Sequence, residues 1–112
     1  MSNKTQIIEP GLYALLSGDF TERIKENALY LLDEPENSLS PKYQLELVQL
    51  IEEYARFYGC QFVISTHSPF FLAMPGAKVY NLDLYPAREC KWTELENVRA
   101  YYDFFKEHEK EF

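Results

Sequence analysis

The chain has 112 residues, which suits one small domain built around one core. Hydrophobic residues make up 46% and aromatic residues 16% of the chain, and this composition excludes a disordered, weakly hydrophobic polypeptide. The formal net charge of -7 argues against direct binding of DNA or RNA by this chain, because an acidic surface repels phosphate backbones. No apolar run approaches the roughly 18 residues of a membrane span, and no signal-peptide pattern follows the polar start of the sequence. We therefore expect a cytoplasmic protein without membrane contact.

The first predicted element is a helix over residues 12–24, where Leu12, Leu16 and Phe20 recur with helical spacing after a turn at Pro10-Gly11. A continuous apolar run at residues 28–32 follows. It is too short for a helix and does not alternate, so it predicts a strand buried on both faces of a parallel sheet.

A long helix is predicted to begin at Ser40-Pro41, because serine is a favoured N-cap and proline suits the next position. Gly59 is expected to stop this helix. Its apolar stripe is expected to comprise Tyr43, Leu47, Leu50, Ile51, Tyr54 and Tyr58.

A second strand is predicted around residues 62–66, with Cys60 before it as a small core residue and a reduced thiol. Ser68-Pro69 predicts a short helix by the same cap-and-proline pattern. The alternating segment 78–84 predicts a third strand, and a weak strand is considered near Lys91-Trp92. A last helix over 93–112 would be capped by Thr93 or Asn97, with an apolar side formed by Val98, Tyr101, Tyr102, Phe105 and Phe112.

The alternation of strands with helices predicts an α/β fold with at least one βαβ unit and about three mainly parallel strands with flanking helices. Ligands of such sheets bind beyond the carboxyl ends of the strands. Two polar clusters fall at these ends, Asp33-Glu34 and Thr66-His67. Two interpretations stay open from spacing alone: acids that end a strand at the solvent, or a site for a hard cation and a base.

The full string from Leu31 to Pro41 resembles the Walker B motif and the following D-loop of ATP-binding-cassette ATPases. The string from Ser65 to Pro69 resembles their H-loop, one crossover helix later. The resemblance extends through Tyr80, is best over residues 28–83, and is closest to the AAA-type branch related to DNA-repair and defence ATPases. It implies that residues 1–112 form a single incomplete P-loop NTPase domain, corresponding to the C-terminal half of the family's fold.

The resemblance also implies roles for individual residues. Asp33 would help to hold magnesium, Glu34 would be the general base that activates the attacking water, and His67 would contact the γ-phosphate. Ser38 and Ser40 would lie in the loop that faces a second ATPase unit and contribute to nucleotide binding there. The implied cofactors are Mg²⁺ and ATP.

The phosphate-binding string G-x-x-x-x-G-K-S/T does not occur in the sequence, although phosphoryl transfer needs such a cradle. We therefore expect no ATPase activity from this chain alone, and either a homo-oligomer or a complementing N-terminal ATPase half as partner. Two alternatives remain. One is a non-catalytic protein-interaction module, and the other is a metal-dependent nuclease or phosphatase that uses Asp33, Glu34, Glu36 and His67.

Overall fold

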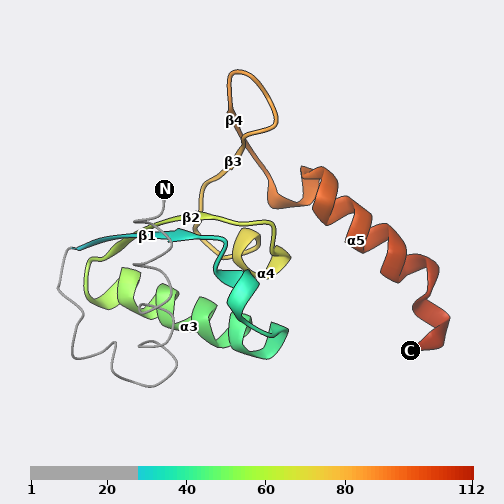
Figure 1. Ribbon diagram of the computed structural model, residues 1–112, viewed down its shortest axis with the longest axis horizontal. Helices are drawn as coiled ribbons and strands as arrows, with labels where there is room; N and C mark the ends of the chain where they lie inside the picture. The colour runs from blue at the N-terminus through green and yellow to red at the C-terminus, as the bar shows by residue number, and fades with distance from the viewer. Residues whose placement is uncertain (1–27) are drawn as a thin grey trace. The chain divides into compact units, whose positions relative to one another are not determined.

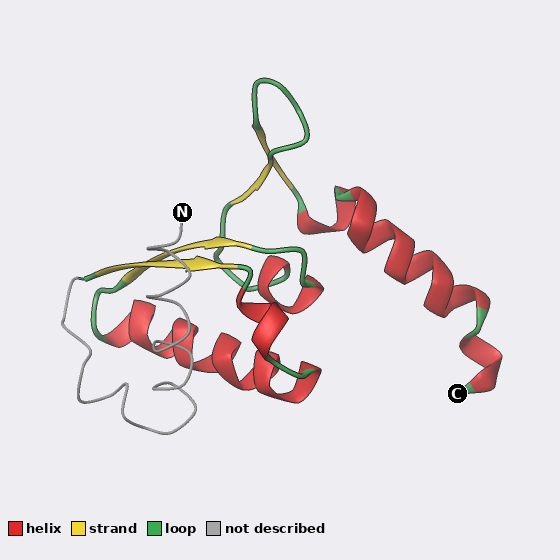
Figure 2. Ribbon diagram, viewed as in Figure 1, coloured by secondary structure: helices red, strands yellow, loops and turns green. Residues whose placement is uncertain are grey.

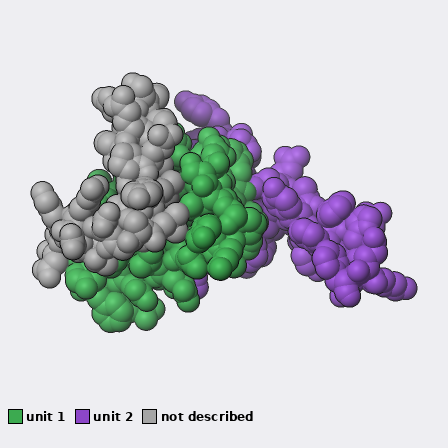
Figure 3. All heavy atoms as spheres, turned by 60° about the horizontal axis from the view of Figure 1, so that its bottom comes forward, with its two compact units in different colours: residues 1–71 green, residues 72–112 purple. Residues whose placement is uncertain are grey.

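The structure is a computed structural model that describes residues 28–112 (Figure 1). The helix expected over residues 12–24 lies outside the described residues. The chain divides into two compact units, and the boundary falls between Phe71 and Leu72 (Figure 3). The expectation of one incomplete domain across the whole chain stays a prediction.

The first unit contains a parallel pair of strands, β1 (Leu29–Asp33) and β2 (Gln61–Ser65). The two strands run in register, so that Asp33 at the end of β1 lies opposite Ser65 at the end of β2. The connection between them contains a 3-10 helix, η1 (Pro35–Ser38), and the long helix α3 (Pro41–Phe57). Helix α3 lies along one side of the strand pair (Figures 1 and 2). This arrangement confirms the predicted strand, helix and strand, and brings the carboxyl ends of both strands to one edge.

Helix α3 begins and ends where the sequence predicted. Ser40 is its N-cap residue and Pro41 its first residue, but the Ser40 side chain makes no capping hydrogen bond. The end is closed by Gly59, whose φ of 64° lies in the left-handed region that glycine tolerates best. The backbone N–H groups of Tyr58 and Cys60 both donate to the carbonyl of Tyr54 there.

The buried core of the first unit is formed mainly by β1, α3 and the segments next to β2. Its apolar members are Leu32, Leu47, Val48, Ile51, Tyr54, Cys60 and Phe71. The predicted stripe of α3 was wrong at its two ends, because Tyr43 is 45% and Tyr58 is 42% exposed. Val48 and the polar Gln44 are buried instead, and Gln44 is accommodated because its side-chain amide is hydrogen-bonded.

The expectation that β1 is buried on both faces was also wrong within the described residues. Leu29 and Leu31 of β1 are 57% and 44% exposed, and Val63, the register partner of Leu31, is 59% exposed. Side chains alternate between the two faces of a strand, so these three residues share a face, which we call the open face. Helix α3 covers the other face, where Tyr30 and Phe62 stack with ring centroids 5.4 Å apart.

A short helix, α4 (Pro69–Leu72), follows β2 and begins after Ser68, as the sequence predicted. The Ser68 hydroxyl accepts a hydrogen bond from the backbone N–H of Phe70 at 3.3 Å. This contact is the capping interaction that the Ser68-Pro69 pair indicated.

The second unit begins with an antiparallel hairpin of β3 (Val79–Asn81) and β4 (Arg88–Cys90). The strand predicted over residues 78–84 therefore exists in shortened form, but it pairs with β4 in a separate sheet rather than with β1 or β2. The parallel sheet of the described residues has two strands. The weak strand considered at Lys91-Trp92 lies slightly earlier, in β4.

Three helical segments complete the second unit, namely η2 (Trp92–Glu94), α5 (Glu96–Glu107) and η3 (Glu109–Glu111). The N-cap residue of α5 is Leu95, so the predicted caps Thr93 and Asn97 were wrong. The start of η2 is capped by the Glu94 carboxylate, which accepts a hydrogen bond from the backbone N–H of Lys91 at 2.8 Å.

Helix α5 buries Val98, but its aromatic residues are half exposed rather than gathered on one buried side. Tyr101, Tyr102, Phe104 and Phe105 are all between 52% and 54% exposed. In the described part of the chain, no helix combines the length and apolar character needed to cross a membrane.

Candidate active site

The turn after β1 aims two neighbouring carboxylates in different directions. The backbone N–H of Glu34 donates to the Ser65 carbonyl at 2.6 Å, which continues the pairing of β1 with β2 by one residue. Glu34 then adopts φ 49° and ψ 56°, a left-handed conformation that is uncommon for residues other than glycine. Pro35 follows as the first residue of η1 and is fully buried. Strained backbone of this kind is found more often at functional sites than elsewhere.

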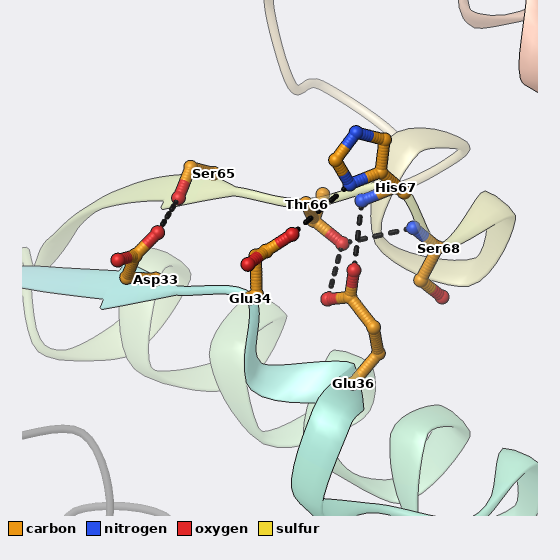
Figure 4. Close-up of polar contacts among 7 residues, drawn as sticks. All are labelled: Asp33, Glu34, Glu36, Ser65, Thr66, His67 and Ser68. Atoms are coloured by element: carbon orange, nitrogen blue, oxygen red, sulfur yellow. Dashed lines mark hydrogen bonds and ion pairs between the residues drawn. The ribbon is translucent and has the colours of Figure 1, made fainter. Parts of the chain in front are cut away.

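Glu34 meets His67 across the gap between the two strand ends (Figure 4). The Oε1 atom of Glu34 lies 3.2 Å from Nδ1 of His67, with the Glu34 side chain 43% and the His67 side chain 78% exposed. A carboxylate that accepts a hydrogen bond here requires the His67 tautomer with a hydrogen on Nδ1. The two residues proposed for catalysis from the sequence therefore lie in direct contact.

Asp33 belongs to a different contact. Its Oδ1 atom accepts a hydrogen bond from the hydroxyl of Ser65, its register partner on β2. Figure 4 shows the Asp33 carboxylate turned to Ser65, while that of Glu34 points to His67. Asp33 is half-buried at the end of the strand pair.

Glu36 is the residue that ties the two loops together most closely. Its Oε1 accepts from the Thr66 hydroxyl at 2.6 Å, and its Oε2 accepts from the His67 backbone N–H at 2.8 Å. The Thr66 hydroxyl oxygen in turn accepts from the Ser68 N–H at 3.0 Å. From the sequence, Glu36 was considered only for a nuclease or phosphatase site, and no signal in the sequence indicates its contacts with Thr66 and His67.

A second, buried link lies behind this loop and was missed from the sequence. The Ser68 hydroxyl donates to Gln44 Oε1 at 2.5 Å, and Gln44 Nε2 donates to the Leu39 carbonyl at 3.0 Å. The signal in the sequence that could have indicated this link is the polar Gln44 on the buried side of α3. The link fixes the loop that carries His67 against the start of α3.

Three side chains of the site are spaced closely enough to share a divalent cation. One ligand atom each of Glu34, Glu36 and His67 lies within 4.8 Å of the others. Both oxygens of Glu36 and Nδ1 of His67 are already engaged within the protein, so these atoms form a hydrogen-bonded network. Oδ1 of Asp33 is likewise engaged within the protein, by the hydroxyl of Ser65.

Ser38 and Ser40 lie apart from these contacts. Both are exposed, Ser38 at the end of η1 and Ser40 before α3. The structure thus brings Glu34 and His67 together, places Asp33 beside them in sequence with a partner of its own, and leaves the two serines at the surface.

Comparison with protein families gives one match. A family model described as "AAA domain, putative AbiEii toxin, Type IV TA system" matches residues 10–73, more than half of the chain. The chain belongs to this AAA-domain family. The matched range contains β1, η1, α3 and β2, and therefore the whole network around Glu34, Glu36 and His67.

Comparisons with curated proteins and with solved structures found no match. Membership of the AAA-domain family identifies the chain as an ATPase-related module and associates it with ATP and Mg²⁺. The parallel pair β1–β2 with its helices is compatible with part of a P-loop NTPase fold.

Proposed function

We propose that this chain supplies the magnesium-holding, water-activating and phosphate-contacting side of an ATP-hydrolysing site of the ATP-binding-cassette type. The observation that carries the proposal is the 3.2 Å contact between Glu34 and His67 at adjacent strand ends, with Asp33 one residue before Glu34. A carboxylate and an imidazole that converge at the carboxyl edge of a parallel sheet could supply the base and a phosphate contact for hydrolysis of a bound triphosphate.

In the proposed mechanism, Glu34 orients the attacking water and takes its proton as the water approaches the γ-phosphorus. His67, held through Nδ1 by Glu34, would contact the γ-phosphate with the rest of its imidazole and stabilise the transferring group. Asp33 would hold the metal ion, which when bound neutralises charge on the phosphate oxygens. The exposed Ser38 and Ser40 would face the nucleotide of a second ATPase unit.

The phosphate-binding loop of this site would come from elsewhere, because the string G-x-x-x-x-G-K-S/T does not occur in the sequence. The open face supports this part of the proposal. Parallel sheets are ordinarily covered on both faces, whereas Leu29, Leu31 and Val63 are between 44% and 59% exposed. We infer that the complementing partner, which covers the open face, is an N-terminal ATPase half with a phosphate-binding loop. A second copy of the chain would compete with this partner for the same face.

The proposal is tested by titration with ATP and magnesium, first on this chain and then with an added N-terminal half of an AAA-domain relative that carries the phosphate-binding loop. Nucleotide binding and turnover are expected in the mixture only. Glu34→Gln should lower turnover by about a hundredfold or more while ATP still binds, because it removes the proton acceptor. Glu46→Gln, at an exposed position of α3, is the matched control.

Two outcomes would refute the proposal. One is turnover in the mixture that Glu34→Gln leaves unchanged. The other is turnover by the chain alone that Glu34→Gln abolishes, which would show that the nucleotide grip lies within this sequence.

A second candidate is the non-catalytic interaction module. The half-exposed Tyr101, Tyr102, Phe104 and Phe105 of α5 favour it, because exposed aromatic side chains are enriched where proteins bind one another. A binding partner whose capture depends on these aromatic residues and not on Glu34 or His67 would support this candidate over the ATPase half.

A further inference from the structure

Glu36 differs from Glu34 in where its carboxylate goes. The Glu34 carboxylate contacts the imidazole ring of His67. The two oxygens of Glu36 instead accept hydrogen bonds from the Thr66 hydroxyl and the His67 backbone N–H, which hold the loop after β2. Figure 4 shows the Glu36 side chain rising from η1 into the loop after β2. A carboxylate that accepts two hydrogen bonds with separate oxygens fixes both the distance and the direction of the segment that it binds.

The contact extends over three consecutive residues of that loop. Thr66 donates its hydroxyl to Glu36 and accepts the Ser68 N–H on the same oxygen, while the His67 N–H goes to Glu36 directly. The backbone on both sides of the His67 Cα atom is therefore held, although the His67 side chain is 78% exposed. An exposed imidazole keeps one direction only if its backbone is fixed.

We propose that Glu36 is a positioning residue, which holds the loop of His67 so that its imidazole stays beside Glu34 without itself contacting the nucleotide. The inference rests on the proposed function for the purpose of that imidazole, but the placement itself is testable without catalysis. Charge-assisted hydrogen bonds are stronger than neutral ones, which suits a carboxylate at this position.

The first experiment measures amide hydrogen exchange of His67 by NMR in the full chain. Glu36→Ala removes both acceptors and should speed exchange at His67 by about tenfold or more, since the bond to a charged acceptor is lost. Glu36→Gln, which keeps one carbonyl oxygen, should recover part of the protection. Glu46→Ala is the exposed control on α3, and unchanged exchange at His67 in Glu36→Ala would overturn the proposal.

The second experiment measures turnover in the complemented mixture. Glu36→Ala should lower kcat by about a hundredfold, because a small displacement of a catalytic group is sufficient for such a loss, while KM for ATP changes by about twofold or less. Glu36→Gln should restore part of kcat, and Thr66→Ser, which keeps the hydroxyl, should remain close to wild type.

The two experiments separate the failure of the inference from that of the proposed function. Faster exchange at His67 with unchanged kcat would overturn the positioning role and leave Glu36 as a structural residue. If Glu34→Gln also leaves turnover unchanged, the proposed function fails, and the exchange measurement still decides whether Glu36 holds the loop. If Glu36→Ala does not fold, Glu36→Gln and Thr66→Val carry the exchange test, with faster exchange expected in both.

Discussion

The hydroxyl of Ser68 donates a hydrogen bond of 2.5 Å to the side-chain carbonyl of Gln44, and both residues are less than a tenth exposed. The amide nitrogen of Gln44 donates in turn to the Leu39 carbonyl at 3.0 Å. One glutamine thus links the first turn of α3 to the segment before it and to the loop after β2. The loop of His67 is supported from the buried side by Gln44 and from the exposed side by Glu36.

Replacing Gln44 by leucine should lower the free energy of unfolding by about 1–3 kcal/mol, because the buried Ser68 hydroxyl and the Leu39 carbonyl each lose a partner. Chemical denaturation measures the change. Gln49→Leu, at an exposed position of the same helix, should shift stability by about 0.5 kcal/mol or less. In a double-mutant cycle, Gln44→Leu and Ser68→Ala should cost less together than the sum of the two, and strict additivity would contradict a direct link.

The core depends strongly on Leu47, whose side chain is 0% exposed. Leu47→Ala should destabilise the protein by about 2–5 kcal/mol through lost apolar contacts and the cavity left behind. Leu45→Ala on the same helix is the control, since Leu45 is 51% exposed, and should change stability little. Equal effects of the two substitutions in denaturant unfolding would mean that α3 presents a different face to the strands.

At position 34 a glycine variant should be more stable than an alanine variant, which is the reverse of the usual order. Its φ of 49° costs a residue with a Cβ atom about 1–2 kcal/mol relative to glycine. Glu34→Gly should therefore be more stable than Glu34→Ala by about 1 kcal/mol in thermal or chemical unfolding, although both lack the carboxylate. An alanine variant as stable as the glycine variant would show that the turn is not left-handed.

The pH dependence of stability should carry a contribution from Tyr54. Burial raises the pKa of its hydroxyl above the ordinary value of 10.0, with smaller contributions from the neighbouring Tyr58 and Glu53. The folded state therefore holds this proton more tightly than the unfolded state, so the stabilisation is complete below about pH 10 and is lost as pH rises through the folded-state pKa.

Urea unfolding between pH 9 and 11 measures this effect by comparison with Tyr54→Phe, in which the group cannot ionise. Stability of the parent protein should fall more steeply with pH than that of the variant. Parallel curves would mean that the hydroxyl titrates in the folded protein as it does in the unfolded chain.

The open face should make the isolated chain self-associate. Leu31→Lys places a charge at a position that is 44% exposed on this face, next to Val63. Light scattering should show a species larger than a monomer for the parent chain at high concentration and a shift to the monomer in the variant. Leu82→Lys tests the specificity of this effect, since Leu82 is 75% exposed in the second unit. A parent chain that is monomeric at every concentration would exclude this role of the face.

The strand, long helix and strand of the first unit could be predicted because their signals are local. An apolar run ends at Asp33, a Ser40-Pro41 pair starts α3, and Gly59 stops it. The pairing of β3 could not be predicted in the same way. Its alternation identifies an extended segment but carries no information about which strand it joins, and the partner β4 is a short run with few β-forming residues.

The sequence named the residue types of the candidate site, but it could not indicate their contacts. The resemblance pointed to Asp33, Glu34 and His67, and the structure pairs the last two. It gave no reason to expect the carboxylates of Asp33 and Glu34 to point in different directions. The left-handed backbone conformation at Glu34 cannot be recognised from the sequence, because glutamate is not a residue type that favours it. The bridge from Glu36 joins residues that are 30 and 31 positions apart, and one sequence cannot reveal such a contact.

The polar contacts of Glu34 and Glu36 have a consequence for folding. They close loops of 30 to 33 residues that contain the whole of α3, and loop closure is entropically unfavourable until native contacts compensate for it. The two carboxylates can therefore reach their partners only after the crossover has folded back on itself. A probe placed at His67 would report the opening and closing of the entire strand–helix–strand unit, even with no nucleotide present.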